Sequence, residues 1–397
     1  MELVDKLGNY IERLDRPNSD LRYGIDDVCG ITNTKQLVIG TKANLIGRTF
    51  EKFTILSPRE FIFNRRTSRN GERISLGFNT TDRDWILTED YCHFRIRKDK
   101  EDVLDPNYLY LFFLNPEFDR YVRYNSWGSA TEFFNWEEIT ETPIPIIPIS
   151  MQHKIVHDYQ VITDRIALLR KMNEKLEEAA YLHFQKTFID LYGEQDLPDG
   201  WKMSKLEDLC DVKGGKRLPA DCELIDTHTE HPYIRVRDVG SSRYVCITDQ
   251  FQYIDEDTYN AISRYTVNTG DVVISIVGTI GLIGKIHSSL DGANLTENCV
   301  KLTGVHGVTG DYLYYTLRFK KDIKEIDLLT VGAVQAKLPI YNIQSIKVLV
   351  PPHSVMQDFQ EKLDIINRTV EANTMEIQML NNLKVSYLTG IARGRVL

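Results

Sequence analysis

Two long stretches of the chain repeat apolar residues at alternating spacings of four and three positions. This heptad pattern is typical of a helix that pairs with another helix along one face. The seam positions are Ile155, Tyr159, Ile162, Ile166, Leu169, Asn173, Leu176 and Ala180 in the first stretch, and Phe359, Leu363, Ile366, Val370, Asn373, Ile377 and Leu380 in the second. The pattern predicts long helices at 150–191 and 354–397 that pair as an antiparallel coiled coil. Ser150 and Ser354 are the expected N-caps.

Each seam contains one asparagine, Asn173 or Asn373. A polar side chain in an apolar seam lowers stability but can fix the register of paired helices. The simpler alternative is that both asparagines are tolerated near the edge of the seam. The sequence leaves both interpretations open.

The remaining chain has the shorter patterns of mixed α/β domains. Runs rich in β-branched residues at 233–237 and 271–277 predict strands. Residues 109–114 and 312–319 fit amphipathic helices, and 192–201 fits a linker. We therefore predict one globular domain at 1–149 and a second at 192–353, each followed by a long helix.

The chain contains an internal repeat of about 204 residues. The matching segments are 108–111 with 312–315, 128–130 with 332–334, Ile139 with Ile343, Pro148 with Pro352, and Met151-Gln152 with Met356-Gln357 after a slip of one residue. Residues 88–90 also match 296–298, and 59–63 match 270–274, when short loop insertions are allowed. So many matches in one order indicate a duplication, and hence two α/β domains in tandem repeat.

Composition places the chain among globular proteins, since 42% of its residues are hydrophobic and 26% are charged. No apolar run has membrane-spanning length and the first residues lack the apolar core of a signal peptide, so we expect a cytoplasmic protein. Its six cysteines have no C-x-x-C spacing and are expected to be reduced. The net charge of −9 does not exclude nucleic acid, because phosphate binding depends on a local basic surface.

Two motifs that suggest cofactor chemistry are incomplete. Residues 278–285 resemble a phosphate-binding loop, but Thr279 and Ile286 stand where that loop requires a glycine and a Ser or Thr. Residues 115–118 resemble the Asn-Pro-Pro-aromatic loop of amino-methyltransferases, but Glu117 replaces the second proline. We therefore expect no nucleotide or S-adenosylmethionine site in this chain.

The histidines do not complete a metal site either. His153 and His157 have the spacing of a zinc-binding pair, but Lys154 stands where a metalloprotease carries its glutamate. His228 and His231 have no obvious third ligand. With no complete catalytic constellation, we expect no catalytic residue and no metal in this chain.

Several segments of the second half carry a family resemblance. They are Gly214-Gly215-Lys216-Arg217-Leu218-Pro219, 233–239, 270–275 with Gly278-Thr279-Ile280-Gly281, 294–298 and Gln335-Ala336-Lys337-Leu338. These segments resemble the target-recognition domains of the DNA-specificity subunits of type I restriction–modification systems. In the first half, 27–33, Asn70-Gly71, 128–130 and 136–139 correspond, although the Gly-Asp and Gly-Thr-x-Gly pattern is missing there.

The resemblance implies that each domain recognises one half of a bipartite asymmetric DNA site. It implies that the two helices set the unread spacer and dock two methyltransferase subunits, which bind S-adenosylmethionine. Restriction subunits that use ATP and Mg would join through the methyltransferase core. None of these cofactors is expected on this chain.

Candidate DNA contacts are the basic and amide side chains on loops. Arg, Lys, Asn and Gln read base edges, and cations bind phosphates. The candidates are Arg65, Arg66, Arg69, Asn70 and Arg73 in the first domain, and Lys213, Lys216, Arg217, Arg235, Arg237, Lys285, Gln335 and Lys337 in the second. For any one of them, the alternative is an ordinary charged surface.

Two other functions remain open. The chain could belong to a related system in which one partner polypeptide both methylates and cleaves DNA. It could also be a stand-alone DNA-binding regulator or a scaffold, which would need no methyltransferase to bind.

Overall fold

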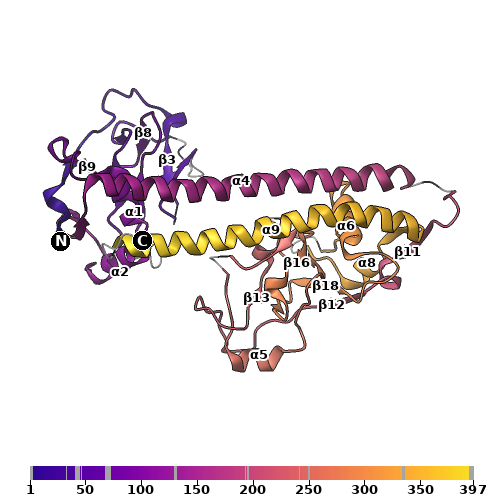
Figure 1. Cartoon of the computed structure of the whole chain (residues 1–397). Coiled ribbons are helices and arrows are strands. Elements are labelled where there is room, and N and C mark those ends of the chain that lie inside the picture. The colour runs from indigo at the N-terminus through magenta and orange to yellow at the C-terminus, as the bar shows by residue number, and fades with distance from the viewer. Residues whose placement is uncertain are drawn as a thin grey trace. The chain divides into compact units, whose positions relative to one another are not determined.

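The structure is a computed structural model that describes residues 3–32, 34–40, 45, 47–67, 73–128, 132–192, 194, 196–240, 242–248, 251–332 and 336–392. The chain forms two compact units, one of residues 1–170 with 374–397 and the other of residues 171–373. The longest elements are the helices α4 (Ile149–Phe188) and α9 (His353–Ala392), drawn in magenta and yellow in Figure 1. Within the described ranges, no helix combines the length and apolar character that a membrane crossing requires.

The first unit contains a four-stranded antiparallel sheet in the order β2-β9-β6-β7. Its strands and short helices are β1 (Leu3–Lys6), β2 (Ile11–Leu14), β3 (Cys29–Ile31), β4 (Leu37–Ile39), β5 (Thr54–Leu56), β6 (Phe61–Asn64), β7 (Leu76–Phe78), β8 (Trp85–Leu87), β9 (Tyr91–Ile96), α1 (Pro106–Phe113), α2 (Pro116–Tyr124), α3 (Trp136–Thr140) and β10 (Pro143–Ile146). A separate ribbon pairs β1 with β10, and Leu3 lies opposite Ile146. Buried phenylalanines of the sheet and of α1, such as Phe61, Phe94 and Phe113, fill the core.

The second unit contains a five-stranded sheet in the order β12-β18-β15-β16-β14. Its elements are β11 (Lys202–Lys205), β12 (Asp211–Gly214), β13 (Tyr233–Ile234), β14 (Tyr244–Val245), α5 (Glu256–Ile262), β15 (Val272–Ser275), β16 (Ile283–Ile286), β17 (Asn294–Leu295), β18 (Cys299–Thr303), α6 (Gly310–Asp322), α7 (Glu325–Leu328), α8 (Ile340–Gln344) and β19 (Lys347–Val350). Again a ribbon stands apart, with Lys202 of β11 opposite Val350 of β19. The core joins α6 to the sheet and to both long helices through Tyr312, Phe184 and Phe359.

The strand order repeats between the units. β2, β9, β6 and β7 correspond in order and direction to β12, β18, β15 and β16, and the ribbon β1–β10 corresponds to β11–β19. Tyr108 and Tyr312, which are 204 positions apart, are both fully buried. Each donates its hydroxyl to a carbonyl of the ribbon, that of Pro145 or that of Leu349. Thus the duplication inferred from the sequence is also present in the topology.

The long helices begin one residue before the predicted N-caps. Ser150 and Ser354 lie in the first helical turn, because the carbonyls of Pro148 and Pro352 already accept helical hydrogen bonds from the amides of Gln152 and Met356, both at 3.1 Å. The N-caps are therefore Pro148 and Pro352, and the N-cap prediction is wrong by two residues, a common ambiguity at helix ends.

The structure also removes the one-residue slip in the repeat. α4 and α9 each have 40 residues, and their first residues, Ile149 and His353, are 204 positions apart. Gln152 and Met356 occupy the same helical position, and both side chains are buried. The buried amide of Gln152 accepts a hydrogen bond from the backbone of Asp105, a polar role that the thioether of Met356 does not share.

Within each unit, side chains of α4 meet side chains of α9. In the second unit, Asn373 Nδ2 donates to Asn173 Oδ1 at 2.7 Å. In the first unit, Tyr387 donates its hydroxyl to Asp158 Oδ2 at 2.8 Å. The side chains at all the predicted seam positions are buried or half-buried.

Candidate nucleic-acid interface

One edge of the second unit's sheet gathers most of the basic residues predicted there. At this edge β12 and β15 end, and β18 and β16 begin. Lys216 and Arg217 follow β12, and Lys337 forms a β-bridge with Val277, two residues after β15. Arg235 follows β13 at the same edge. The four basic side chains therefore come from loops that are remote in sequence and adjacent in the fold.

The loop that follows β12 is packed tightly against the turn before β18. A Cβ at Gly215 would lie 2.1 Å from the carbonyl oxygen of Thr296, so only glycine fits there. The amide of Lys216 donates to the carbonyl of Leu295 at 2.8 Å, and the hydroxyl of Tyr233 donates to the carbonyl of Lys216 at 2.8 Å. Lys216 and Arg217 thus project from a fixed backbone rather than from a loose loop.

The corresponding edge of the first unit carries its own arginines. Arg65 and Arg66 directly follow β6, and Arg73 precedes β7 by three residues. Arg65 and Arg73 are exposed and Arg66 is half-buried. Over the described ranges, none of the three side chains forms an ion pair. Cations without acidic partners are available for phosphate groups.

A small hairpin flanks this edge in both units. In the first unit, Phe133 forms β-bridges with Arg66 and with Trp127. In the second unit, Lys337 forms β-bridges with Val277 and with Val331. Phe133 and Lys337 are 204 positions apart, as are Trp127 and Val331. The duplication therefore preserved a backbone arrangement beside the edge while its side chains changed.

Two of the predicted contacts at this edge have acidic partners. Arg217 Nε lies 2.7 Å from Glu297 Oε1, although the arginine side chain remains 80% exposed. Burial opposes ionisation of Glu297, but the hydrogen bonds from Arg217, from Thr296 and from the backbone, together with the charge of Arg217, hold the pKa of Glu297 below its usual value. Arg235 is half-buried and forms two hydrogen bonds with Asp238. A partnered arginine can still reach a base, but it must give up or share its carboxylate.

Lys285 does not join this edge. It pairs with Val272 at the opposite end of the sheet, and its ammonium group lies 2.7 Å from the buried carboxylate of Asp311. Lys213 lies within β12, is exposed and pairs with Asp211 at 2.8 Å. Arg237 is exposed and lies 4.0 Å from Asp238. Arg69, Asn70 and Gln335 lie outside the described residues.

The structure adds exposed apolar side chains that sequence reasoning missed. Trp127 in the flanking hairpin is 69% exposed, and Tyr124 at the end of α2 is 84% exposed. Their counterparts 204 positions later, Val331 and Leu328, are also exposed. The repeat was the signal that could have found them, because a large apolar residue stands at both positions in both copies. Apolar side chains in a groove can contact thymine methyl groups or pack between bases.

The described part of the chain offers little for other chemistry. It contains no group of three or more His, Cys, Asp or Glu side chains that could hold a metal ion. His153 and His157 are exposed on α4, and His231 pairs with Glu256. Burial raises the pKa of the Cys29 thiol to about 12, which makes it a poor nucleophile at neutral pH.

The chain is similar to known DNA-specificity proteins. A family model described as the type I restriction modification DNA specificity domain matches residues 198–382. The chain is similar to the type I restriction enzyme MjaIX specificity subunit of Methanocaldococcus jannaschii, with 24% identity over 318 residues, which cover 75% of this chain and 70% of that protein. It is also similar to the type I restriction enzyme HindI specificity subunit of Haemophilus influenzae, with 21% identity over 202 residues, 50% of this chain and 42% of that protein.

A solved structure supports the fold. The crystal structure of the type I restriction–modification S subunit from M. genitalium matches with a TM-score of 0.51 and 15% identity, and the match covers 99% of this chain and 96% of that one. At this identity the likeness shows a shared mixed α/β fold with long helices.

Proposed function

We propose that the chain is a DNA-recognition subunit of the type I restriction–modification family and that its two domains read the two halves of a bipartite asymmetric site. The observation that carries this proposal is the repeated sheet edge with its flanking hairpin. Arg65 and Arg73 line it in the first domain, and Lys216 and Lys337 in the second. Two equivalent edges with different side chains suit two half-sites of different sequence.

The side chains at each edge divide between phosphate and base contacts. Arg65 and Lys337 are exposed and form no ion pair with any residue that the structure describes, which suits phosphate binding that is independent of sequence. Arg217 and Arg235 are held by carboxylates in defined directions, which suits contacts with base edges. Arg69, Asn70 and Gln335, which lie outside the described residues, remain DNA contacts predicted from the sequence.

We further propose that α4 and α9 pair as an antiparallel coiled coil that sets the unread spacer. The hydrogen bond between Asn173 and Asn373 supports this pairing, because two amides in an apolar seam satisfy each other in one register only. The ion pair of Arg165 with Glu376 adds a second polar contact between the helices. Both contacts lie where the sequence places the helix seams or their borders.

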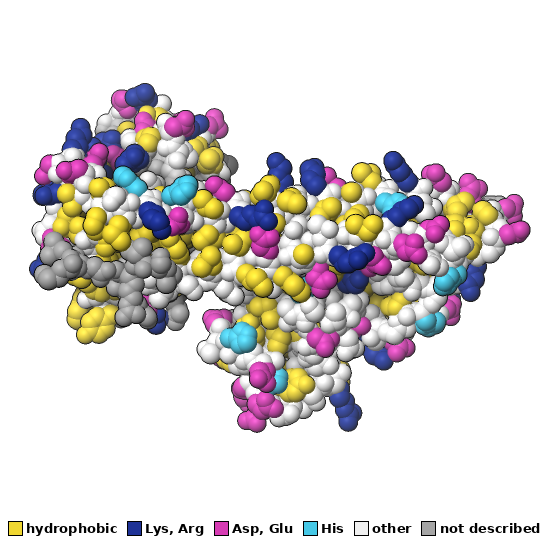
Figure 2. Space-filling model, in the orientation of Figure 1, with side chains coloured by type: hydrophobic (Ala, Val, Ile, Leu, Met, Phe, Trp, Pro, Cys, Tyr) yellow, Lys and Arg dark blue, Asp and Glu magenta, His cyan; other side chains and the backbone are white. Residues whose placement is uncertain are grey.

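Methyltransferase subunits would dock on the exposed apolar side chains of the long helices. Val161 of α4 is 53% exposed and Ile365 of α9 is 64% exposed, and the two are 204 positions apart. Figure 2 shows hydrophobic side chains at intervals on the surface of these helices, between lysines and arginines. Two equivalent apolar positions suit two copies of one partner. Restriction subunits would join through the methyltransferases.

In this proposal the chain itself supplies no catalytic group. S-adenosylmethionine would bind to the methyltransferase subunits, and ATP and Mg to the restriction subunits. The chain would select the DNA site that is methylated. This role requires only DNA binding.

Deletion of the gene and mapping of adenine methylation across the genome test the function directly. We expect one bipartite asymmetric motif to lose methylation and to regain it when the gene is restored. Complementation with the Val161→Asp, Ile365→Asp double variant should fail, although its recognition edges are unchanged. An unchanged methylome in an organism that expresses the partner genes would refute the proposal.

Binding of the purified chain separates this function from that of a regulator. A specificity subunit should bind its site tightly only after methyltransferase subunits have joined. A stand-alone regulator should bind equally well without them.

A further inference from the structure

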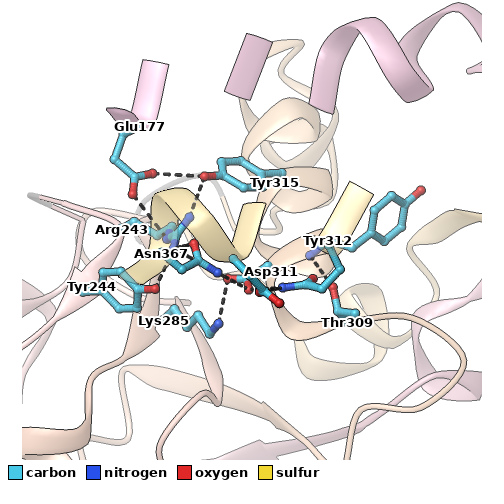
Figure 3. A network of polar contacts seen from close by, with 11 residues as sticks. Glu177, Arg243, Tyr244, Lys285, Thr309, Asp311, Tyr312, Tyr315 and Asn367 are labelled. Atoms are coloured by element: carbon cyan, nitrogen blue, oxygen red, sulfur yellow. Dashed lines mark hydrogen bonds and ion pairs between the residues drawn. The ribbon is translucent and has the colours of Figure 1, made fainter. Parts of the chain in front are cut away.

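A buried charge network joins the second domain to both long helices (Figure 3). At its centre Arg243, which directly precedes β14, is 2% exposed. Its guanidinium donates to the hydroxyls of Tyr315 at 2.7 Å and Tyr244 at 2.6 Å. It also forms an ion pair with Glu177 of α4 at 3.3 Å and a hydrogen bond to Asn367 of α9. One side chain therefore contacts the domain and both helices.

Asp311 at the start of α6 forms the second centre of the network. Its carboxylate accepts hydrogen bonds from Lys285 of β16 at 2.7 Å, and from Asn367 at 2.9 Å and Gln360 at 3.1 Å on α9. Although burial opposes ionisation, Lys285 and Arg243 hold the pKa of Asp311 below its ordinary value. The network thus contains two basic and two acidic side chains, and burial raises the pKa of Glu177.

The first domain fills the equivalent place with different side chains. Asn107 and Leu111 stand 204 positions before Asp311 and Tyr315. Phe78 lies opposite Phe61 in the sheet where Lys285 lies opposite Val272. The ring of Phe78 packs against Tyr110 with centroids 5.2 Å apart. The hydroxyl of Tyr110 donates to the carbonyl of Lys35, whose buried ammonium group pairs with Asp119 at 2.8 Å. The first domain therefore buries an ion pair of its own beside this position, with different partners.

Buried ion pairs add little stability compared with apolar packing, because both charges lose their hydration. They do impose geometry, since a planar guanidinium satisfies its donors only in one arrangement. An apolar junction tolerates small rotations, whereas this network would lose several hydrogen bonds on rotation. The network therefore restricts the orientation of the second domain on the helices more than it adds to stability.

We propose that Arg243 is a positioning residue that fixes the angle of the second recognition domain on α4 and α9, and thereby the spacer length at which the second half-site is accepted. This inference rests on the proposed reading of a bipartite site. One added base pair moves a half-site by about 3.4 Å and turns it by about 35°. A domain held at one angle cannot follow that change, whereas a loosened domain can.

Methylation by the assembled complex on a panel of duplexes tests the proposal. The duplexes carry both half-sites at the native spacing, one base pair shorter and one base pair longer. The test variant is Arg243→Met with Glu177→Gln, which removes the pair without leaving a buried charge unpaired. We expect its preference for the native spacing to fall by about tenfold, the scale of one lost charge-assisted contact. Discrimination against base changes within either half-site should stay at the wild-type level.

A second variant keeps the test informative if the double variant fails to fold. Tyr315→Phe removes one acceptor of Arg243 and keeps the buried ring, and it should relax the spacing preference by a smaller factor in the same direction. A variant that melts normally and keeps the wild-type spacing preference would overturn the proposal. If the wild-type complex methylates without any bipartite sequence preference, the proposed function fails and the inference fails with it. Loss of preference only in the variants leaves the function intact and supports the inference.

Discussion

The arginines at the edge of the first domain give the sharpest prediction. Arg65 and Arg73 are exposed and flank the connection from β6 to β7. Replacing both by alanine removes two cations that we assign to phosphates. Because both side chains are on the surface, the free energy of unfolding should change by less than about 0.5 kcal/mol per site. The effect should therefore appear in DNA binding alone.

The size of the effect follows from counterion release. Each neutralised phosphate contributes about −0.9 to the slope of log affinity against log salt concentration. Loss of two contacts should make the slope shallower by about 1.8. Between 50 and 200 mM salt, the wild-type complex should therefore lose about 12-fold more affinity than the double variant loses. At low salt, where the contacts are strongest, the wild type should bind much more tightly.

The assay is a salt titration of the complex on its own site, followed by fluorescence anisotropy. The matched control is Arg97→Ala with Lys98→Ala, two exposed cations that follow β9 at the opposite end of the same sheet. This control changes the net charge equally but should leave the slope unchanged. Equal slopes for the wild type and the Arg65, Arg73 variant would refute the assignment of this edge. Equal losses in the test and control variants would mean that only the net charge matters.

Four further predictions concern single side chains. Trp127→Ala should weaken DNA binding by roughly 1 kcal/mol, about fivefold, without changing the salt slope, because the indole is uncharged. Tyr312→Phe should lower the free energy of unfolding in urea by about 1 kcal/mol, since the buried carbonyl of Leu349 loses its donor, and Tyr108→Phe should behave alike in the first domain. Asn373→Leu should lower the melting temperature, because Asn173 loses its partner, whereas leucine at both positions should restore or raise it. Burial lowers the pKa of His287, so the unfolded chain binds more protons than the folded chain near pH 6. The free energy of unfolding should therefore fall as the pH drops below 6.5, and it should fall less in the His287→Gln variant.

The long helices and the repeat could be predicted from the sequence because their signals are periodic. A heptad seam such as Ile162, Ile166 and Leu169 specifies a helix by spacing alone. The exact helix starts could not be predicted. Serine is common at N-caps, but it also occurs inside the first helical turn, so its presence does not fix the first residue of the helix. The carbonyls of Pro148 and Pro352 decide the matter through hydrogen bonds that only the folded chain displays.

Some residues of the candidate site could likewise be predicted from the sequence, and others could not. Arg65 and Lys216 could be placed on loops because they directly follow strand-like runs or glycines. The sequence predicts Lys285 as a DNA contact as well, yet the strand register puts it at the other end of the sheet, beside a carboxylate 26 positions away. Arg243 has no local signal beyond its neighbour Tyr244, because its other partners come from α4, α6 and α9. Tertiary partners of a single charged residue leave no pattern in the sequence around it.

The two antiparallel ribbons have a consequence for how such a chain changes in evolution. Leu3 lies opposite Ile146, and Lys202 lies opposite Val350, so the chain enters and leaves each domain through adjacent strands at the root of a long helix. The residues between these two strands form the rest of the domain, and the chain leaves the domain next to the point where it entered. A recombination event that replaces residues 7–142 or 206–346 therefore exchanges one whole domain and preserves the ribbon and the helix that follows it. In the proposed function, new combinations of half-sites can arise in this way in a single step, without any intermediate that must refold the shared scaffold.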